Sequence, residues 1–223
     1  QSGFDDALRA LRADLSFDAV KVGAVSTPGI ARSITDFLSE LDDSTPVVVD
    51  PILTGGSKRR TRIVGALGSA YIALYRQATL MTPNTEELER LGSSLGLEID
   101  RVDDQWLQAA ADSLSTALLV TGGHSDEPGL DRLYEPGADE PVDFAAEVEL
   151  SDVDVHGTGC HFSTAIAALV AQGGSVHEAI SGAKRYMEYL LQHCVWSPGD
   201  GRPQLQHGDE TRAFGRSLVN GRR

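Results

Sequence analysis

The sequence predicts an α/β fold with a mainly parallel central sheet, helices on both faces of that sheet and an antiparallel hairpin at one edge. Two patterns carry this prediction. Up to residue 121, short and fully apolar segments alternate with segments in which apolar residues recur at the period of a helix. This alternation indicates βαβ units whose strands are buried on both faces. Two further strand-like segments then flank a turn-rich stretch at Pro136-Gly137, which favours an edge hairpin.

The first part of the chain supplies the βαβ units. Two helix starts are marked by capping residues: Thr27 precedes Pro28 as an N-cap, and Asn84 precedes Glu87 at the spacing of a capping box. The apolar periodicity predicts helices over 4–15, 28–41, 63–76, 84–91 and 104–115. Short aliphatic runs predict strands over 19–23, 46–50, 78–81 and 117–121.

The remainder of the chain adds the hairpin and two long helices. We expect the hairpin strands over 130–135 and 142–150, a helix that begins at Gly157-Thr158-Gly159, and a last helix over 176–194. Gly, Pro and charged residues dominate from Trp196, so we expect an irregular tail over 196–223. With 223 residues, 41% of them hydrophobic, the chain is large enough for one domain, which we place over 1–195.

Charge and cysteine content narrow the classes of function. The formal net charge of −14 disfavours binding to nucleic acid or to anionic membranes, because both require a basic face. The sequence contains neither a signal peptide nor an apolar run of about 18 residues that would span a membrane. Cys160 and Cys194 are too few for a disulfide framework and fit a reducing compartment. We therefore expect a cytoplasmic protein.

The stretch His156-Gly157-Thr158-Gly159-Cys160 is the most informative motif. Two glycines at the start of a helix allow a tight turn and point several unpaired N–H groups at one place, where the helix dipole also favours negative charge. This pattern predicts a phosphate cradle, and the helix N-terminus is expected to stabilise a thiolate at Cys160. The alternative is a glycine-rich turn that only starts a helix.

Polar residues close three of the predicted strands. Asp50 ends one strand, Thr82 with Asn84 follows another, and Thr121 with Gly122 and Gly123 follows a third. In parallel sheets, ligands bind outside the carboxyl ends of the strands, so we expect these residues to border a ligand site.

Several of these motifs together resemble one known family. The motifs are Val49-Asp50-Pro51, Thr82-Pro83-Asn84 with Glu87, Val120-Thr121-Gly122-Gly123-His124, Asp131-Arg132-Leu133-Tyr134 and His156-Gly157-Thr158-Gly159-Cys160. Their order and spacing resemble the hydroxymethylpyrimidine and phosphomethylpyrimidine kinases of thiamine biosynthesis, within the ribokinase-like superfamily. The resemblance covers most of residues 18–195, and Cys at position 160 points to this branch, because sugar kinases of the superfamily usually carry Asp there.

The resemblance implies an ATP- and Mg²⁺-dependent transfer of a phosphoryl group to the pyrimidine alcohol and then to its monophosphate. It implies a catalytic group made of Gly157, Thr158, Gly159 and Cys160, with Cys160 as the candidate base. Nucleotide-binding residues would be Asn84, Thr121, Gly122, Gly123, His156, Gly157 and Lys184. Substrate-binding residues would be Val22, Gly23, Ala24 and Cys160. Asp50 and Glu87 would place the Mg²⁺, although Asp50 also fits a plain strand end and Glu87 a plain capping box.

The chain also departs from the family pattern, and the departures define the alternatives. The family's opening strand and glycine-rich segment are absent, Ala24 stands where a substrate-facing Met is common, and Thr121 stands where Lys is frequent. One alternative is a kinase of pyridoxal or the thiazole alcohol, because similar kinases share the nucleotide half. Another is a non-catalytic nucleotide-binding module. By resemblance we also expect a homodimer.

Overall fold

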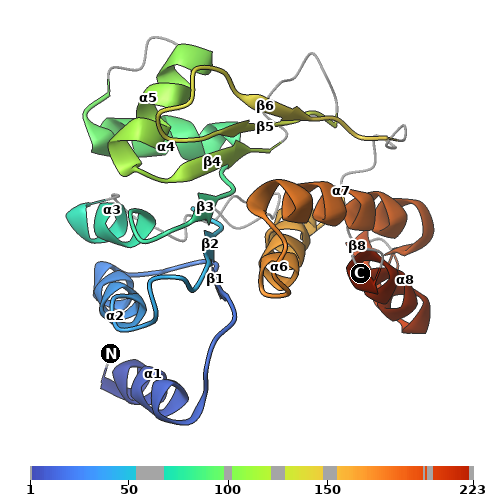
Figure 1. Cartoon of the computed structure of the whole chain (residues 1–223), viewed down its shortest axis with the longest axis horizontal. Helices are drawn as coiled ribbons and strands as arrows, with labels where there is room; N and C mark the ends of the chain where they lie inside the picture. The colour runs from blue at the N-terminus through green and yellow to red at the C-terminus, as the bar shows by residue number, and fades with distance from the viewer. Residues whose placement is uncertain are drawn as a thin grey trace.

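Six strands form one sheet in the order β1-β2-β3-β4-β5-β6 in this computed structural model, which describes residues 2–53, 68–97, 102–121, 129–147, 155–197, 199 and 203–220 (Figure 1). The strands are β1 (Val20–Val22), β2 (Val47–Val49), β3 (Leu80–Met81), β4 (Ala117–Val120), β5 (Asp131–Tyr134) and β6 (Val142–Phe144). The first four pair in parallel, and β5 and β6 pair antiparallel. The predicted fold class is confirmed.

Helices cover both faces of the sheet (Figure 1). They are α1 (Ser2–Asp14), α2 (Pro28–Leu38), α3 (Ser69–Tyr75), α4 (Thr85–Leu95), α5 (Asp104–Leu114), α6 (Thr158–Val170), α7 (Val176–His193) and α8 (Asp209–Asn220). Val47 and Val49 belong to the core cluster that contains α2 to α5, whereas Val48 belongs to the cluster that contains α6 and α7. Successive side chains of a strand point to opposite faces, so burial on both faces explains why β2 is apolar at every position.

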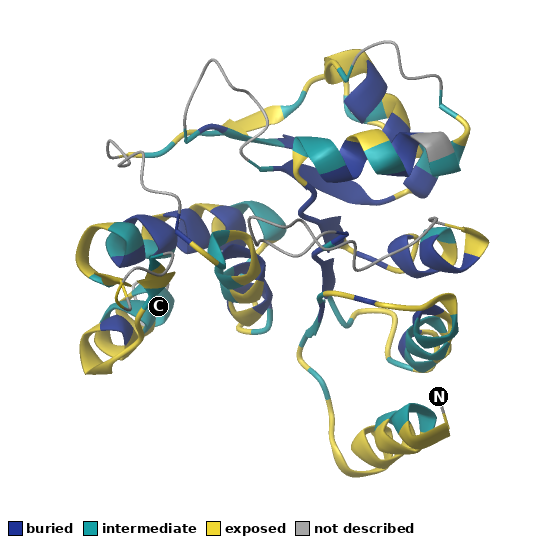
Figure 2. Cartoon of the chain, turned by 180° about the vertical axis from the view of Figure 1, so that it is seen from behind, coloured by how far each residue is buried: buried dark blue, intermediate teal, exposed yellow. Residues whose placement is uncertain are grey.

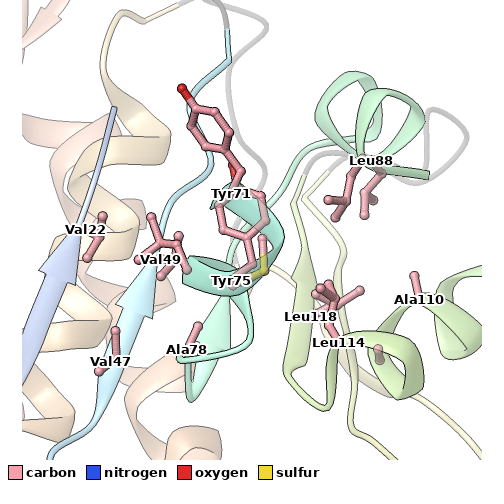
Figure 3. Close-up of a cluster of buried hydrophobic side chains, with 14 of the residues drawn as sticks. Val22, Val47, Val49, Tyr71, Tyr75, Ala78, Leu88, Ala110, Leu114 and Leu118 are labelled. Carbon is pink, nitrogen blue, oxygen red and sulfur yellow. The ribbon is translucent and has the colours of Figure 1, made fainter. Parts of the chain in front are cut away.

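The larger cluster gathers side chains from β1, β2 and β4 against α3, α4 and α5 (Figure 3). Tyr71 and Tyr75 of α3 lie over Val49 in this view, and Leu118 of β4 lies beside Leu114 of α5. The central strands β2, β3 and β4 are dark blue throughout when the chain is coloured by burial, while α1 is mostly yellow and contains no buried residue (Figure 2).

The predicted helix starts have the expected capping geometry. Thr27 Oγ1 accepts from the backbone N–H of Ile30, and Pro28 takes the first helical position. Asn84 and Glu87 form the full capping box at the start of α4. The ends differ by a few residues: α2 stops at Leu38 and α4 continues to Leu95. The start of the helix expected over 63–76 lies outside the described residues, whereas the strand expected over 142–150 is shorter and ends at Phe144.

The expectation of an irregular tail from Trp196 is wrong. β7 (Val195–Trp196) pairs antiparallel with β8 (Gln204–Leu205), and α8 follows. The helix is held by aromatic packing, because the ring of Phe214 stacks on that of Tyr189 at 4.3 Å between centroids. Thr211 is buried as well. The glycine and charge content of this segment concealed an amphipathic helix that becomes stable only by packing on α7. Among the described helices, none is both long and apolar enough to span a membrane.

Leu118 of β4 is 0% exposed, so we expect the packing of its side chain to contribute strongly to stability. Leu118→Ala should lower the free energy of unfolding by about 2–5 kcal/mol, through lost burial and the cavity left behind. Urea unfolding followed by circular dichroism measures this change. Leu11→Ala on α1, where the side chain is 44% exposed, is the control and should cost less than about 1 kcal/mol. Equal losses would contradict the described core.

Candidate active site

Asp50 lies directly after β2, at the carboxyl edge of the parallel strands. Its backbone N–H donates to the carbonyl of Val22 at 2.9 Å and so continues the pairing of β1 with β2 by one residue. Strand alternation turns its side chain toward the face covered by α6, the same face as Val48. The residue is only 5% exposed, so a charged carboxylate there requires compensating partners.

Two elements, β1 and α6, provide those partners. Lys21 of β1 brings its Nζ to 3.4 Å from Asp50 Oδ2, and the fully buried Ser163 of α6 donates its hydroxyl to the same oxygen at 3.0 Å. The thiol of Cys160 lies near enough for the carboxylate of Asp50 to raise its pKa. Asp50 therefore joins two neighbouring strands to the first turn of α6.

Sequence reasoning missed Lys21 and Ser163 as members of the site. A signal for Ser163 existed, because it stands three residues after Cys160 and so shares a helix face with it. Lys21 was visible as a charged residue within a short apolar strand. Neither signal is specific without knowing which faces of the sheet and the helix meet.

Glu87 has both of the roles that the sequence left open. Its carboxylate accepts from the backbone N–H of Asn84 at 3.0 Å, which completes the capping box. It is also 8% exposed and interacts electrostatically with Asp50. Burial raises the pKa of Glu87 to about 7, with the charge of Asp50 adding to the rise, while backbone N–H donors at Asn84 and Leu53 oppose it.

The residues at this edge fit a divalent cation. Two buried carboxylates, those of Asp50 and Glu87, interact unfavourably, and oxygen ligands of this kind are those that Mg²⁺ prefers, directly or through water. Within the described residues, the buried hydroxyl of Thr82 beside them has no hydrogen-bond partner. A bound cation would favour the ionised form of Glu87 and so reverse the effect of burial on its pKa.

Gly157 makes the turn that starts α6. It has φ of +87°, a left-handed conformation that favours glycine, and a Cβ there would lie 3.4 Å from the ring of His161. That ring donates from Nδ1 to the Gly157 carbonyl at 2.6 Å and stacks on His207, which fixes the turn. Gly159 differs, because a Cβ there would meet no atom within 4 Å. The phosphate cradle at this turn stays a prediction.

The structure does not support the thiolate that the sequence predicted at Cys160. Burial raises the pKa of the Cys160 thiol, and the carboxylates of Asp50 and Glu87 raise it further, whereas Lys21 lowers it. The helix N-terminus does favour a thiolate, but desolvation and two nearby negative charges oppose it. Cys160 is therefore a neutral thiol at neutral pH.

The predicted nucleotide residues are only partly brought together. Asn84 and Thr121 form a parallel bridge, with the Thr121 N–H donating to the Pro83 carbonyl at 3.1 Å, so they are neighbours across β3 and β4. Gly122 and Gly123 lie outside the described residues. His156 is exposed and pairs with Gln204.

Lys184 is held away from such a role. Its ammonium donates to Asp131 of β5 at 2.5 Å in a largely buried ion pair, so its charge is already partnered within the protein.

The predicted substrate residues follow β1 to the same edge. Val22 itself is buried in the core, so its side chain does not face a substrate. Gly23 leaves room for Lys21, since a Cβ would lie 3.1 Å from its Nζ, and Ala24 is exposed. A separate cavity of about 790 Å³ lies between α6 and α8. Cys160 is among its lining residues, whereas Asp50 and Glu87 are not.

The mostly parallel six-stranded sheet with helices on both faces is the ribokinase-like fold of solved pyridoxal kinases. The chain is similar to pyridoxal kinase of Bacillus subtilis, solved as an ADP complex, with a TM-score of 0.67 and 25% identity over 91% of this chain and 74% of that one. It is also similar to pyridoxal kinase of Staphylococcus aureus in complex with AMP-PCP and pyridoxal, with a TM-score of 0.68 and 22% identity over 94% and 72% of the two chains.

Within this class, residues 2–204 match the phosphomethylpyrimidine kinase family, and the chain belongs to that family. It is 32% identical to the hydroxymethylpyrimidine/phosphomethylpyrimidine kinase of Streptomyces coelicolor over 90% of this chain and 72% of that protein. It is 31% identical to the corresponding kinase of Mycobacterium tuberculosis over 83% of this chain and 66% of that protein. A bifunctional thiamine biosynthesis protein ThiED of Geobacter sulfurreducens is 35% identical over 84% of this chain, which spans 37% of that protein.

The two glycines of the turn should respond differently to alanine. Gly157→Ala should lower the free energy of unfolding by about 1–2 kcal/mol, because a side chain is strained in the left-handed region. Gly159→Ala should leave stability within about 1 kcal/mol, since its backbone is not left-handed and a Cβ has open space. Urea unfolding of both variants checks the described turn. Equal losses would contradict it.

The raised pKa of Glu87 makes stability depend on pH. The folded state favours the neutral form of Glu87, because its pKa is about 7 in the folded protein and about 4.3 in the unfolded chain. The free energy of unfolding is therefore highest below about pH 4.3 and falls as the pH rises through about 7. In metal-free buffer, the free energy of unfolding of the wild type should fall by on the order of 3 kcal/mol between these pH values, and Glu87→Gln should remove this fall. Gln can keep the capping box. Glu89→Gln, at an exposed position of α4, should keep the decline. A decline that persists in Glu87→Gln would contradict this account.

Proposed function

We propose that the chain is a kinase that transfers the terminal phosphoryl group of ATP to 4-amino-5-hydroxymethyl-2-methylpyrimidine, to its monophosphate, or to both, in thiamine biosynthesis. Family membership supports the reaction class, and the relatives named above carry the names of such kinases. One structural observation carries the proposal furthest. Ser163 of α6 donates to Asp50, and Asp50 raises the pKa of Cys160, so the start of α6 lies close to the carboxyl edge of β2.

Phosphoryl transfer needs positioning and charge stabilisation more than covalent chemistry. In the proposed reaction, the backbone N–H groups at the start of α6 face the transferring phosphoryl group. Asp50 and Glu87 would hold a Mg²⁺ ion, which would neutralise phosphate charge when bound. Cys160 would lie beside the acceptor hydroxyl. Its thiol, whose pKa is raised by burial and by the nearby Asp50, is the candidate base of the proposal.

A pyridoxal kinase is the second candidate. The observation in its favour is the similarity to the B. subtilis pyridoxal kinase at 25% identity over 91% of the chain. The distinction concerns the acceptor alone, because both candidates use ATP in the same way. A homodimer belongs to the proposal as well, and light scattering measures it.

The function is tested by incubating the protein with ATP, Mg²⁺ and one acceptor at a time, with the product mass read directly. The acceptors are hydroxymethylpyrimidine, its monophosphate and pyridoxal. A phosphorylated pyrimidine is the expected product. Phosphorylated pyridoxal alone would favour the second candidate. Folded protein that binds ATP and phosphorylates none of the three would contradict the proposal and favour a non-catalytic nucleotide-binding module.

Removing the thiol tests whether Cys160 takes part in proton transfer. Cys160→Ala should lower kcat by roughly a hundredfold, the usual contribution of a group that moves a proton, and should change the affinity for ATP much less. Cys194→Ala removes the other thiol, at the end of α7, and serves as the control with wild-type kinetics. An unchanged kcat in Cys160→Ala would exclude Cys160 from proton transfer.

A further inference from the structure

The hydroxyl of Thr82 is buried without any hydrogen-bond partner within the described residues. The residue is 6% exposed and follows β3. A buried hydroxyl that makes no hydrogen bond destabilises the fold relative to one that is satisfied. Such a group requires an explanation, because buried polar atoms in native proteins are paired in the great majority of cases.

The pairing of β2 with β3 places Thr82 beside Asp50. Val49 pairs with Met81, and the N–H of Thr82 donates to the Val49 carbonyl at 3.0 Å, so the two chains continue side by side for one more residue. Neighbouring strands lie about 4.8 Å apart. Asp50 and Thr82 are therefore adjacent at the carboxyl edge of the sheet.

Both side chains lie on the same face of the sheet. Val48 and Leu80 belong to the cluster under α6 and α7, while Val49 and Met81 belong to the opposite cluster. Because side chains alternate along a strand, residues 50 and 82 return to the face covered by α6. The hydrogen bond from Ser163 to Asp50 confirms this direction for the first of them. Asp50 is thus satisfied by α6, and its neighbour Thr82 is not.

We propose that the Thr82 hydroxyl is a ligand-binding group that contacts an oxygen of the metal–nucleotide complex, either a phosphate oxygen or a water bound to the divalent cation. The inference rests on the proposed function for the identity of the ligand. A hydroxyl suits both oxygens, because it donates to a phosphate and accepts from a water. It adds no negative charge to an edge that already contains Asp50 and Glu87.

The test replaces Thr82 with the isosteric Val. In the protein without ligand, Thr82→Val should leave the unfolding equilibrium constant unchanged or lower it by up to about tenfold, because an unsatisfied hydroxyl is removed. The dissociation constant for Mn²⁺·ADP, measured by electron paramagnetic resonance and calorimetry, should rise roughly tenfold. Thr82→Ser keeps the hydroxyl and should keep the affinity. Titrations with Mn²⁺ alone and ADP alone separate the two oxygens: a loss with Mn²⁺ alone indicates the metal-bound water, and a loss with ADP alone indicates the phosphate.

Thr116→Val is the matched control. Thr116 is also buried, but its hydroxyl donates to the Tyr75 carbonyl at 3.0 Å. This variant should therefore lose stability and keep its affinity for Mn²⁺·ADP, the reverse of the result expected for Thr82.

A wild-type affinity in Thr82→Val overturns the inference, as does the absence of Mn²⁺·ADP binding by the wild-type protein. Neither measurement depends on turnover. If the wild type phosphorylates a pyrimidine while Thr82→Val binds normally, only the inference fails. If the wild type phosphorylates none of the acceptors while Thr82→Val binds more weakly, the proposed function fails and the inference stands.

Discussion

The hydrogen bond between Ser163 and Asp50 is the contact on which the arrangement of the site depends. It is buried, it spans 113 residues of sequence, and it fixes the start of α6 over the carboxyl ends of β1 and β2. The helix is directed there by its own packing, since Phe162 and Ile166 belong to the cluster that covers Val48. Packing of α6 in the core therefore sets the positions of Ser163 and of the glycine turn that starts the helix.

The site combines this rigid placement with unfavourable electrostatics. Burial and a second carboxylate raise the pKa of Glu87 to about 7, and burial with Asp50 raises the pKa of the Cys160 thiol. Thr82 adds a buried hydroxyl that makes no hydrogen bond within the described residues. In the proposed function, all three costs would be relieved by the same event, the binding of a cation with its phosphate and water oxygens. The site is thus built at some expense in stability, as is common where a fold keeps groups ready for a ligand.

Much of the fold was predictable from local patterns. The apolar strands, the N-cap at Thr27 and the capping box of Asn84 with Glu87 are short-range features, and the structure confirms them. The helix α8 was missed because its stability comes from the stacking of Phe214 on Tyr189, a contact between separate helices. For the same reason, the sequence indicated Asp50 as a site residue but not Ser163 or Lys21, which join it only when three elements pack. The charge state of Cys160 required the nearby carboxylates as well as the helix terminus.

The most direct test of the account is a crystal structure of the protein with Mn²⁺ and AMP-PCP, in which anomalous scattering locates the metal. The account predicts Mn²⁺ at the carboxyl edge of β2, held by Asp50 and Glu87 directly or through water, with the terminal phosphate against the N–H groups that start α6. A nucleotide bound in the cavity between α6 and α8, or a metal remote from Asp50, would contradict it.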